Sequence, residues 1–217
     1  MKVEIVSDTI CPWCYIGEKK FTLALNHIKT QYPDLPVEVE WRPFQLYPET
    51  PKEGVNRKEA MKRKFGGGRQ GREIAKTIEH NGAAVGIRFN FEAQEKTPNT
   101  LDSHRLIRWS KSAGCQDAVV EALFRGYFIE GRDIGDPEVL TAIAEESGMD
   151  ASIVSDLLKT DADESAIRAQ DIEARELGIA GVPAFIFNEK FTVGGAQDVE
   201  TFVRIMNKVI EKLEPQT

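Results

Sequence analysis

Two cysteines near the start of the chain are the residues best suited to do chemistry. Cys11 and Cys14 enclose Pro12 and Trp13 in the segment SDTICPWCYIG, residues 7–17. A Cys-x-x-Cys pair can be half of a zinc site, a structural disulfide or a redox centre. Choosing between these three requires the rest of the sequence.

The metal alternative fails on the number of ligands. A structural zinc ion needs about four Cys or His ligands, whereas the whole chain has three cysteines and three histidines. Cys115 is isolated, and His27, His80 and His104 are widely separated. The sequence therefore predicts no metal site.

The first residues show no signal-peptide pattern, because Lys2, Glu4 and Asp8 interrupt any apolar segment. No apolar run approaches the roughly 18 residues of a membrane-spanning helix. We therefore expect a cytoplasmic protein that does not insert into membranes. In that reducing compartment a lasting structural disulfide is disfavoured, which leaves the redox centre as the preferred interpretation.

The composition is that of an ordinary globular protein, with 217 residues, 41% hydrophobic residues and a net charge of −7. Nucleic-acid binding needs a basic surface, so this charge argues against it. Cations concentrate in KRKFGGGRQGR, residues 62–72, which lacks the ending of a phosphate-binding P-loop. This stretch is either an exposed loop or a cover beside the active site that attracts carboxylate-bearing substrates.

A β-α-β unit is predicted to position the cysteines. Residues 2–8 and 37–44 alternate like strands, and the segment between them has helical spacing and begins near Pro12. Cys11 then lies at the N-terminus of a helix, where the dipole favours the thiolate, and Cys14 is more enclosed one turn later. This asymmetry suits an exchange in which Cys11 attacks a disulfide and Cys14 resolves the mixed disulfide.

The middle of the chain reads as helical, and strand patterns return only at residues 183–188 and 190–195, followed by an amphipathic helix at 198–213. The four strands would form one sheet with helices on both faces. The sequence thus predicts an α/β fold. Its expected parts are a discontinuous domain of residues 1–50 and 162–217 and a helical insertion of residues 51–161.

Pro183 opens the first of the late strands, in the segment GIAGVPAFIFN. X–Pro bonds are the common site of cis peptides, and a cis Val182–Pro183 bond would leave the Val182 backbone free to pair with an incoming peptide. A trans proline at the start of an edge strand is the alternative.

Taken together, these segments resemble the DsbA-like branch of the thioredoxin superfamily. Within that branch the sequence is most similar to the FrnE-like group, which also includes 2-hydroxychromene-2-carboxylate isomerases and kappa-class glutathione transferases. The resemblance covers essentially the whole chain and rests on SDTICPWCYIG, TPNTLDSHRLIRW and LGIAGVPAFIFNEKFTVGGAQ. It implies a thioredoxin-like fold with a large all-helical insertion, and a thiol-disulfide oxidoreductase.

The resemblance also implies roles for individual residues. Cys11 would be the nucleophile, Cys14 the resolving thiol, and Pro183 a cis-proline that faces them. The residues expected to bind substrate are Pro12, Trp13, Val182 and Pro183, with Gly195 and His104 as weaker candidates.

Glutathione-dependent relatives typically carry serine where Cys11 stands, so the two cysteines of this chain favour disulfide exchange over isomerisation. In those relatives a turn after the last strand helps to hold glutathione, and residues 194–197, which include Gly195, match it loosely. We expect no tightly bound cofactor, with glutathione as a candidate co-substrate. The expected partners are proteins or small molecules that carry thiols or disulfides.

Several alternatives stay open at this point. His104 either faces the cysteines and moves a proton or is an ordinary helical histidine, and Cys115 is interpreted as a small inert residue. One rival function is a glutathione-dependent isomerase or transferase, and another is a redox-sensing or chaperone-like binding protein. The direction of electron flow, the substrate and the oligomeric state, including a dimer, are not fixed by the sequence.

Overall fold

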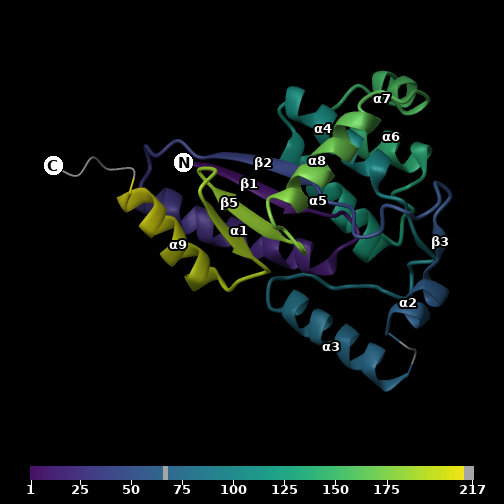
Figure 1. Ribbon diagram of the computed structural model, residues 1–217, viewed down its shortest axis with the longest axis horizontal. Helices are drawn as coiled ribbons and strands as arrows, with labels where there is room; N and C mark the ends of the chain where they lie inside the picture. Colours follow the sequence, from purple (N-terminus) through teal and green to yellow (C-terminus); the bar gives the residue numbers. More distant parts are fainter. Residues whose placement is uncertain (66–67, 213–217) are drawn as a thin grey trace.

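The computed structural model describes residues 1–65 and 68–212, and its centre is a four-stranded sheet in the order β2-β1-β5-β6 (Figure 1). The central strand β1 runs parallel to β2 and antiparallel to β5, which in turn pairs antiparallel with β6 at the edge. The sheet therefore joins the two ends of the chain, as predicted. Its strands are β1 (Lys2–Ser7), β2 (Glu38–Pro43), β5 (Ala184–Phe187) and β6 (Phe191–Gly194).

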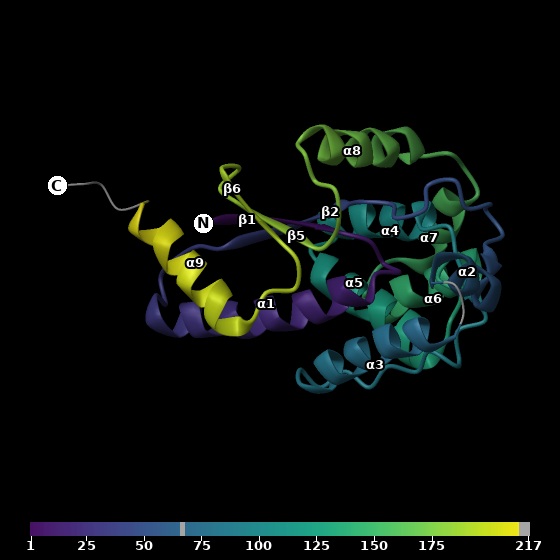
Figure 2. The same ribbon diagram turned by 60° about the horizontal axis from the view of Figure 1, so that its bottom comes forward.

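Three helices cover the sheet: α1 (Pro12–Gln31), α8 (Glu164–Glu176) and α9 (Val199–Glu211). Figure 2 shows α1 and α9 on one face and α8 on the other. Successive side chains of a strand point to opposite faces, so Ile5 and its cross-strand partner Phe185 join the large apolar cluster with α1 and α9. Val6 and its partner Ala184 join a smaller cluster with Ala174 of α8.

Between β2 and α8 the chain is mostly helical, as predicted. Its helices are α2 (Arg57–Phe65), α3 (Arg69–Ala83), α4 (Leu101–Ser112), α5 (Gln116–Arg125), the π-helix η1 (Gly126–Glu130), α6 (Pro137–Glu146) and α7 (Ala151–Leu158). Two short antiparallel strands that the sequence did not reveal lie in the same region, β3 (Val55–Asn56) and β4 (Lys96–Thr97). The domain boundaries given above stay a prediction.

Capping side chains mark the starts of two helices. The Asp136 carboxylate accepts a hydrogen bond from the Glu138 N–H at 2.9 Å and caps α6, whose first residue is a proline. The Asp198 carboxylate caps α9 in the same way through the Thr201 N–H at 2.7 Å. The predicted last residue of that helix, Leu213, is outside the described residues. None of the helices described is both long and apolar enough to cross a membrane.

One buried cation ties α4 to the connection between α7 and α8. Arg105 is fully buried, and its Nη1 donates to the Asp102 carboxylate at 2.7 Å. Its other guanidinium nitrogens donate to the backbone carbonyl oxygens of Leu157, Thr160 and Ala162 at 2.7 to 2.8 Å. A buried charge must be paired and hydrogen-bonded, and this network meets that condition while it fixes the helix that carries His104.

Candidate functional site

Cys11 lies where the first strand gives way to the first helix. It is the N-cap residue of α1, with extended backbone angles and Pro12 as the first helical residue. Its N–H donates to the Asp8 carbonyl oxygen at 3.0 Å, which closes the turn after β1. Pro12 and Trp13 are half-buried in the first turn of α1. The structure thus places the predicted nucleophile at the predicted helix end.

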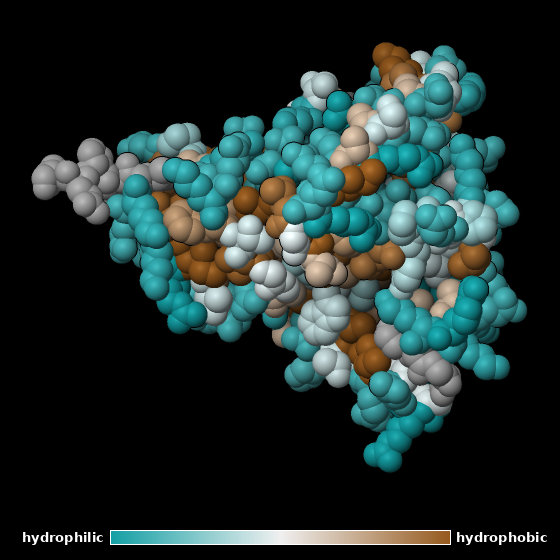
Figure 3. Space-filling model, in the orientation of Figure 1, coloured by the Kyte–Doolittle hydropathy of each residue, from teal (hydrophilic) through white to brown (hydrophobic). Residues whose placement is uncertain are grey.

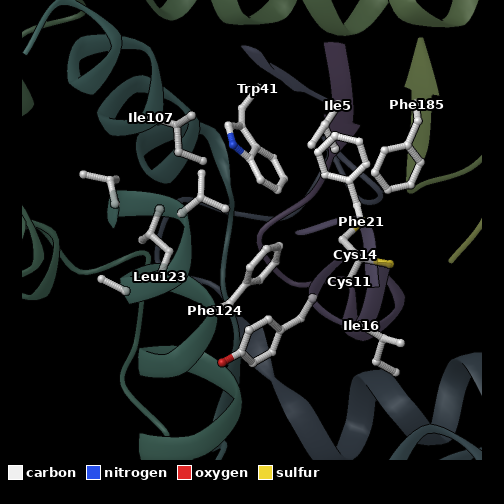
Figure 4. Packing of buried hydrophobic residues seen from close by; sticks show 14 of the residues in the cluster. Ile5, Cys11, Cys14, Ile16, Phe21, Trp41, Ile107, Leu123, Phe124 and Phe185 are labelled. Atoms are coloured by element: carbon white, nitrogen blue, oxygen red, sulfur yellow. The ribbon is translucent and has the colours of Figure 1, made fainter. Parts of the chain in front are cut away.

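Cys14 lies one turn further along α1 and is 1% exposed, against 5% for Cys11. Both thiols are free, and they lie at the edge of the apolar cluster that contains Phe21 (Figure 4). Burial raises the pKa of the Cys14 thiol well above its ordinary value, and the Cys11 thiol beside it raises that pKa further. The Ser7 hydroxyl and a backbone group of Asp8 act in the opposite direction. Cys14 is therefore the more enclosed of the two thiols and has the neutral form as its favoured state.

The segment that contains the late proline lies beside Cys11. The Val182–Pro183 peptide bond is cis. The Cys11 thiol donates to the Val182 carbonyl oxygen at 3.6 Å, and Pro183 is buried while Val182 is half-buried. Residues 182–183, near the end of the chain, thereby form part of the environment of Cys11.

Two glycines allow the proline segment to pack closely. A Cβ added to Gly17 of α1 would lie 2.9 Å from Cγ of Pro183 and 3.4 Å from Cβ of Ala196. Gly195 has a positive φ of 82°, and its N–H donates to the Pro183 carbonyl oxygen at 2.7 Å. The turn predicted to hold glutathione therefore lies beside Pro183, and its role in binding stays a prediction.

His104 lies beside the buried Asp8, which stands in the turn before the cysteines. Its Nε2 atom lies 3.5 Å from Oδ1 of Asp8, and the two side chains are 3% and 0% exposed. The other carboxylate oxygen of Asp8 accepts a hydrogen bond from the Leu46 N–H at 2.7 Å. Next to this pair the Thr9 and Ser103 hydroxyls are hydrogen-bonded at 2.8 Å. A role of His104 in substrate binding stays a prediction.

Sequence reasoning missed Ser7 and Asp8 as neighbours of the site. Ser7 is the last residue of β1 and Asp8 follows it, at a strand end where polar residues are typical of a solvated turn, yet both are almost completely buried. The available signal was their place immediately before the cysteine motif. Since α4 is distant in the sequence, nothing local predicted that it would cover them.

The remaining candidates are Cys115 and the basic stretch. Cys115 is half-buried at the start of α5, where its thiol donates to the Ser110 carbonyl oxygen at 3.8 Å. The described part of the basic stretch lies on α2 and α3, and Lys64 places its ammonium group 4.9 Å from the centre of the Tyr47 ring. Residues 66–67 of that stretch are outside the described part. Among the residues described, no group of three or more His, Cys, Asp or Glu side chains is placed to hold a metal ion.

The face of the molecule that is turned to the viewer in Figure 3 carries exposed hydrophobic side chains. Figure 3 shows hydrophobic side chains gathered across the middle of this face, between the hydrophilic surfaces around α8 and α3. Exposed apolar patches of this kind are typical of binding surfaces.

Comparison with known proteins agrees with this geometry. Residues 2–207 match the family model of the DsbA-like thioredoxin domain. The crystal structure of a probable DsbA oxidoreductase from Streptomyces coelicolor is 31% identical, covers 100% of this chain and 93% of its own, and has a TM-score of 0.87. The protein YwbO of Bacillus subtilis (strain 168) is 26% identical over 195 residues, which are 89% of this chain and 90% of YwbO.

A more distant similarity concerns the fold alone. The cytosolic disulfide reductase DsbM from Pseudomonas aeruginosa, solved with glutathione, is 13% identical, with a TM-score of 0.66 over 97% of this chain and 100% of DsbM. The family match covers nearly the whole chain and includes both the cysteine pair and the late proline. The chain therefore belongs to the DsbA-like thioredoxin domain family.

Proposed function

We propose that the protein is a thiol-disulfide oxidoreductase in which Cys11 is the nucleophile and Cys14 the resolving thiol. The observation that carries this proposal is the contact of the Cys11 thiol with the Val182 carbonyl oxygen, at 3.6 Å, with Cys14 enclosed beneath it. Cys11 is the more exposed of the two thiols, at 5% against 1% for Cys14, and is therefore the one assigned to meet the substrate. Val182 and Pro183 would hold the substrate backbone, and Pro12 and Trp13 would line the same approach.

The reaction balances with the groups of the chain and one disulfide substrate. The Cys11 thiolate attacks one substrate sulfur, which forms a mixed disulfide and releases the first substrate thiolate. Cys14 loses its proton and attacks the Cys11 sulfur, which forms the Cys11–Cys14 disulfide and releases the second thiolate. Two electrons pass from the protein to the substrate, and an external thiol returns them. The steps run in reverse when the protein acts as an oxidant.

The decisive experiment follows the turnover of insulin or of a small disulfide with an excess of an external thiol. We expect Cys11→Ser to abolish turnover, since no other group occupies the place of its sulfur. Undiminished turnover in the Cys11→Ser protein would overturn the mechanism. The reduction potential of the pair against glutathione then decides the direction of electron flow.

Glutathione is the external thiol that we propose. DsbM, which shares the fold, was solved with glutathione, and the turn that contains Gly195 lies beside Pro183. The name of DsbM also places that protein in the cytosol, and we propose the cytoplasm for this chain. The test compares how fast glutathione and a cationic thiol of similar reactivity reduce the Cys11–Cys14 disulfide. A faster reaction with glutathione would support a dedicated site near Gly195, whereas equal rates would argue against one.

A glutathione-dependent isomerase or transferase is the second candidate, because the chain shares its fold with a protein solved with glutathione. It predicts conjugation of glutathione to a chromogenic electrophile, and the discriminating measurement is whether conjugation needs Cys11. A redox sensor or chaperone-like protein would instead be oxidised once per molecule, without repeated turnover. Both cysteines are present as free thiols, and their side chains interact, which favours the oxidoreductase.

A further inference from the structure

A small cavity leads from the buried side of the cysteine motif to the protein surface. It has a volume of about 40 Å³ and lies between β2, α4 and α8. Its inner lining includes Ser7 and His104, which are 5% and 3% exposed, and its outer lining includes Arg108 and Lys111, whose side chains are 42% and 50% exposed. A water molecule needs roughly 10–15 Å³ of such space. The cavity therefore has room for water between buried and exposed groups.

Beside the inner lining of the cavity, two buried polar atoms face each other without a hydrogen bond between them. Nε2 of His104 and Oδ1 of Asp8 lie 3.5 Å apart, and within the described residues neither has a hydrogen-bond partner. Buried polar atoms are nearly always paired, because an unpaired one is costly. A proton placed between these two atoms would satisfy both. The pair is therefore suited to accept a proton.

Ser7 connects this pair to the resolving cysteine. Its hydroxyl interacts with the Cys14 thiol, and the same residue lines the cavity together with His104. A serine hydroxyl can donate one hydrogen bond while it accepts another. Ser7 thus lies between the Cys14 sulfur on one side and the water-sized space on the other.

The charged groups around the cavity do not compete for this proton, because they are already paired with one another. The ion pairs are Lys111–Glu40, Arg108–Asp163, Arg42–Glu4 and Arg42–Glu173. On the other side, the charge of Asp8 acts on the buried Tyr127 phenol, whose hydroxyl accepts a hydrogen bond from Arg57. Asp8 is therefore the carboxylate that lies next to His104.

We propose that Ser7, His104 and Asp8 take up the proton that Cys14 loses when it resolves the mixed disulfide, and that the cavity leads this proton to solvent. In this step the Cys14 S–H bond breaks and the Cys14–Cys11 sulfur bond forms. The Cys11–substrate bond breaks, and its electron pair leaves with the substrate thiolate. The proton passes through the Ser7 hydroxyl and cavity water to Nε2 of His104, where Asp8 stabilises the imidazolium. This inference rests on the proposed function and extends it.

The enclosure of Cys14 explains why such a route is needed. Burial favours the neutral thiol there, whereas only the thiolate attacks a disulfide. Ser7, His104 and Asp8 are positioning and proton-transfer groups in this proposal, and none of them touches the substrate.

The test separates the two steps by rapid mixing of the reduced protein with dithiobis-nitrobenzoate, in a Cys115→Ala background. Attack by Cys11 releases the first coloured thiolate, and resolution by Cys14 releases the second. We expect His104→Gln to slow the second release about tenfold or more. We also expect it to flatten the pH dependence of that release across the range in which histidine usually titrates, about pH 5 to 8. The first release should keep its rate.

Two further variants make the result decisive. Ser7→Ala removes one hydroxyl and should slow the second release alone, so it decides the question if His104→Gln fails to fold. His80→Gln, on an exposed helix position, is the matched control and should leave both phases unchanged. The proposal is wrong if the second release keeps its rate and pH profile in the folded variants, or if both releases slow equally.

Failure of this inference and failure of the proposed function give different results. If the route is wrong, both thiolates are still released in two steps and Cys11→Ser still abolishes the reaction. If the proposed function is wrong, Cys11→Ser retains turnover whatever the His104 and Ser7 variants do.

Discussion

The Cys11 thiol lies 3.6 Å from the carbonyl oxygen of Val182, although 171 positions separate the two residues in the chain. The antiparallel pairing of β1 with β5, in which Val6 lies opposite Ala184, brings them together. In the proposed function, a substrate on the Cys11 sulfur would lie beside the Val182 backbone.

Replacement of the resolving thiol should trap the intermediate. In Cys14→Ser the mixed disulfide on Cys11 has no internal thiol to displace it, so we expect covalent adducts to accumulate in place of turnover. Mass spectrometry without reductant measures these adducts directly. Cys115→Ala, the matched control, should turn over normally and carry none. Equal adducts on Cys14→Ser and on Cys11→Ser would contradict the assignment.

A methyl group at Gly17 should disturb the site through Pro183. Alanine gains up to about 1 kcal/mol of helix propensity over glycine, but overpacking costs about 1–3 kcal/mol. The added Cβ would lie 2.9 Å from the proline ring, a rigid neighbour, so overpacking should win. We expect Gly17→Ala to lower the unfolding free energy by about 1 kcal/mol and to slow turnover several-fold.

Urea denaturation and a turnover assay check this pair of effects. Gly194→Ala is the control for stability, because a Cβ there meets nothing within 4 Å. A Gly17→Ala protein as stable and as active as the wild type would show that Pro183 can shift at no cost.

Loss of the buried Arg105 should be severe. Arg105→Ala leaves the Asp102 carboxylate without the guanidinium and three carbonyl oxygens without their donor, and breaking a buried pair in this way costs about 3–5 kcal/mol. Chemical denaturation measures the loss. Arg168→Ala removes a 53% exposed partner of Glu164 and should cost at most about 1 kcal/mol. Similar losses in the two variants would mean that the Arg105 network adds little.

Glu18 should make stability depend on pH. Burial raises the pKa of its carboxyl above 4.5, and Glu121 nearby raises it further, while Lys19 lowers it. A raised carboxyl pKa means that its contribution to stability is present below pH 4.5 and is lost as the pH rises through the folded-state value. Glu18→Gln stays neutral and should escape this loss.

Thermal unfolding at several pH values measures the effect. The melting temperature of Glu18→Gln should match the wild type in acid and exceed it at neutral pH, by about 2–4 °C for each kcal/mol of relief. Glu73→Gln, at an exposed position of α3, should follow the wild type throughout. A variant that is less stable than the wild type at neutral pH would show that the ion pair with Lys19 outweighs burial.

The sequence predicts the first half of the site well because local chemistry sets it. Pro12 starts a helix, so Cys11 falls at its end, and the alternation of Ile5 and Val6 assigns the faces of β1. Asp8 could not be found in this way, because a polar residue after a strand looks exposed. Its burial depends on α4, a distant helix whose position follows from packing.

Other differences have the same origin. The π-helix at Gly126–Glu130 continues the apolar face of α5, so the sequence pattern reads as one uninterrupted helix. The strands β3 and β4 have two residues each, too few for alternation to be visible. The sequence offers His104 as a candidate, yet only the structure shows that its Nε2 lies 3.5 Å from Oδ1 of the buried Asp8.

The distance in sequence between Cys11 and Val182 also has a consequence for biosynthesis. A ribosome adds about 5–20 residues per second, so the 171 positions between them take roughly ten to thirty seconds to make. Throughout that interval the cysteine motif has emerged without the segment that will cover it. During synthesis the two thiols are therefore not yet covered by the Val182 segment. The enclosed site forms only once the last strands have been added to the sheet.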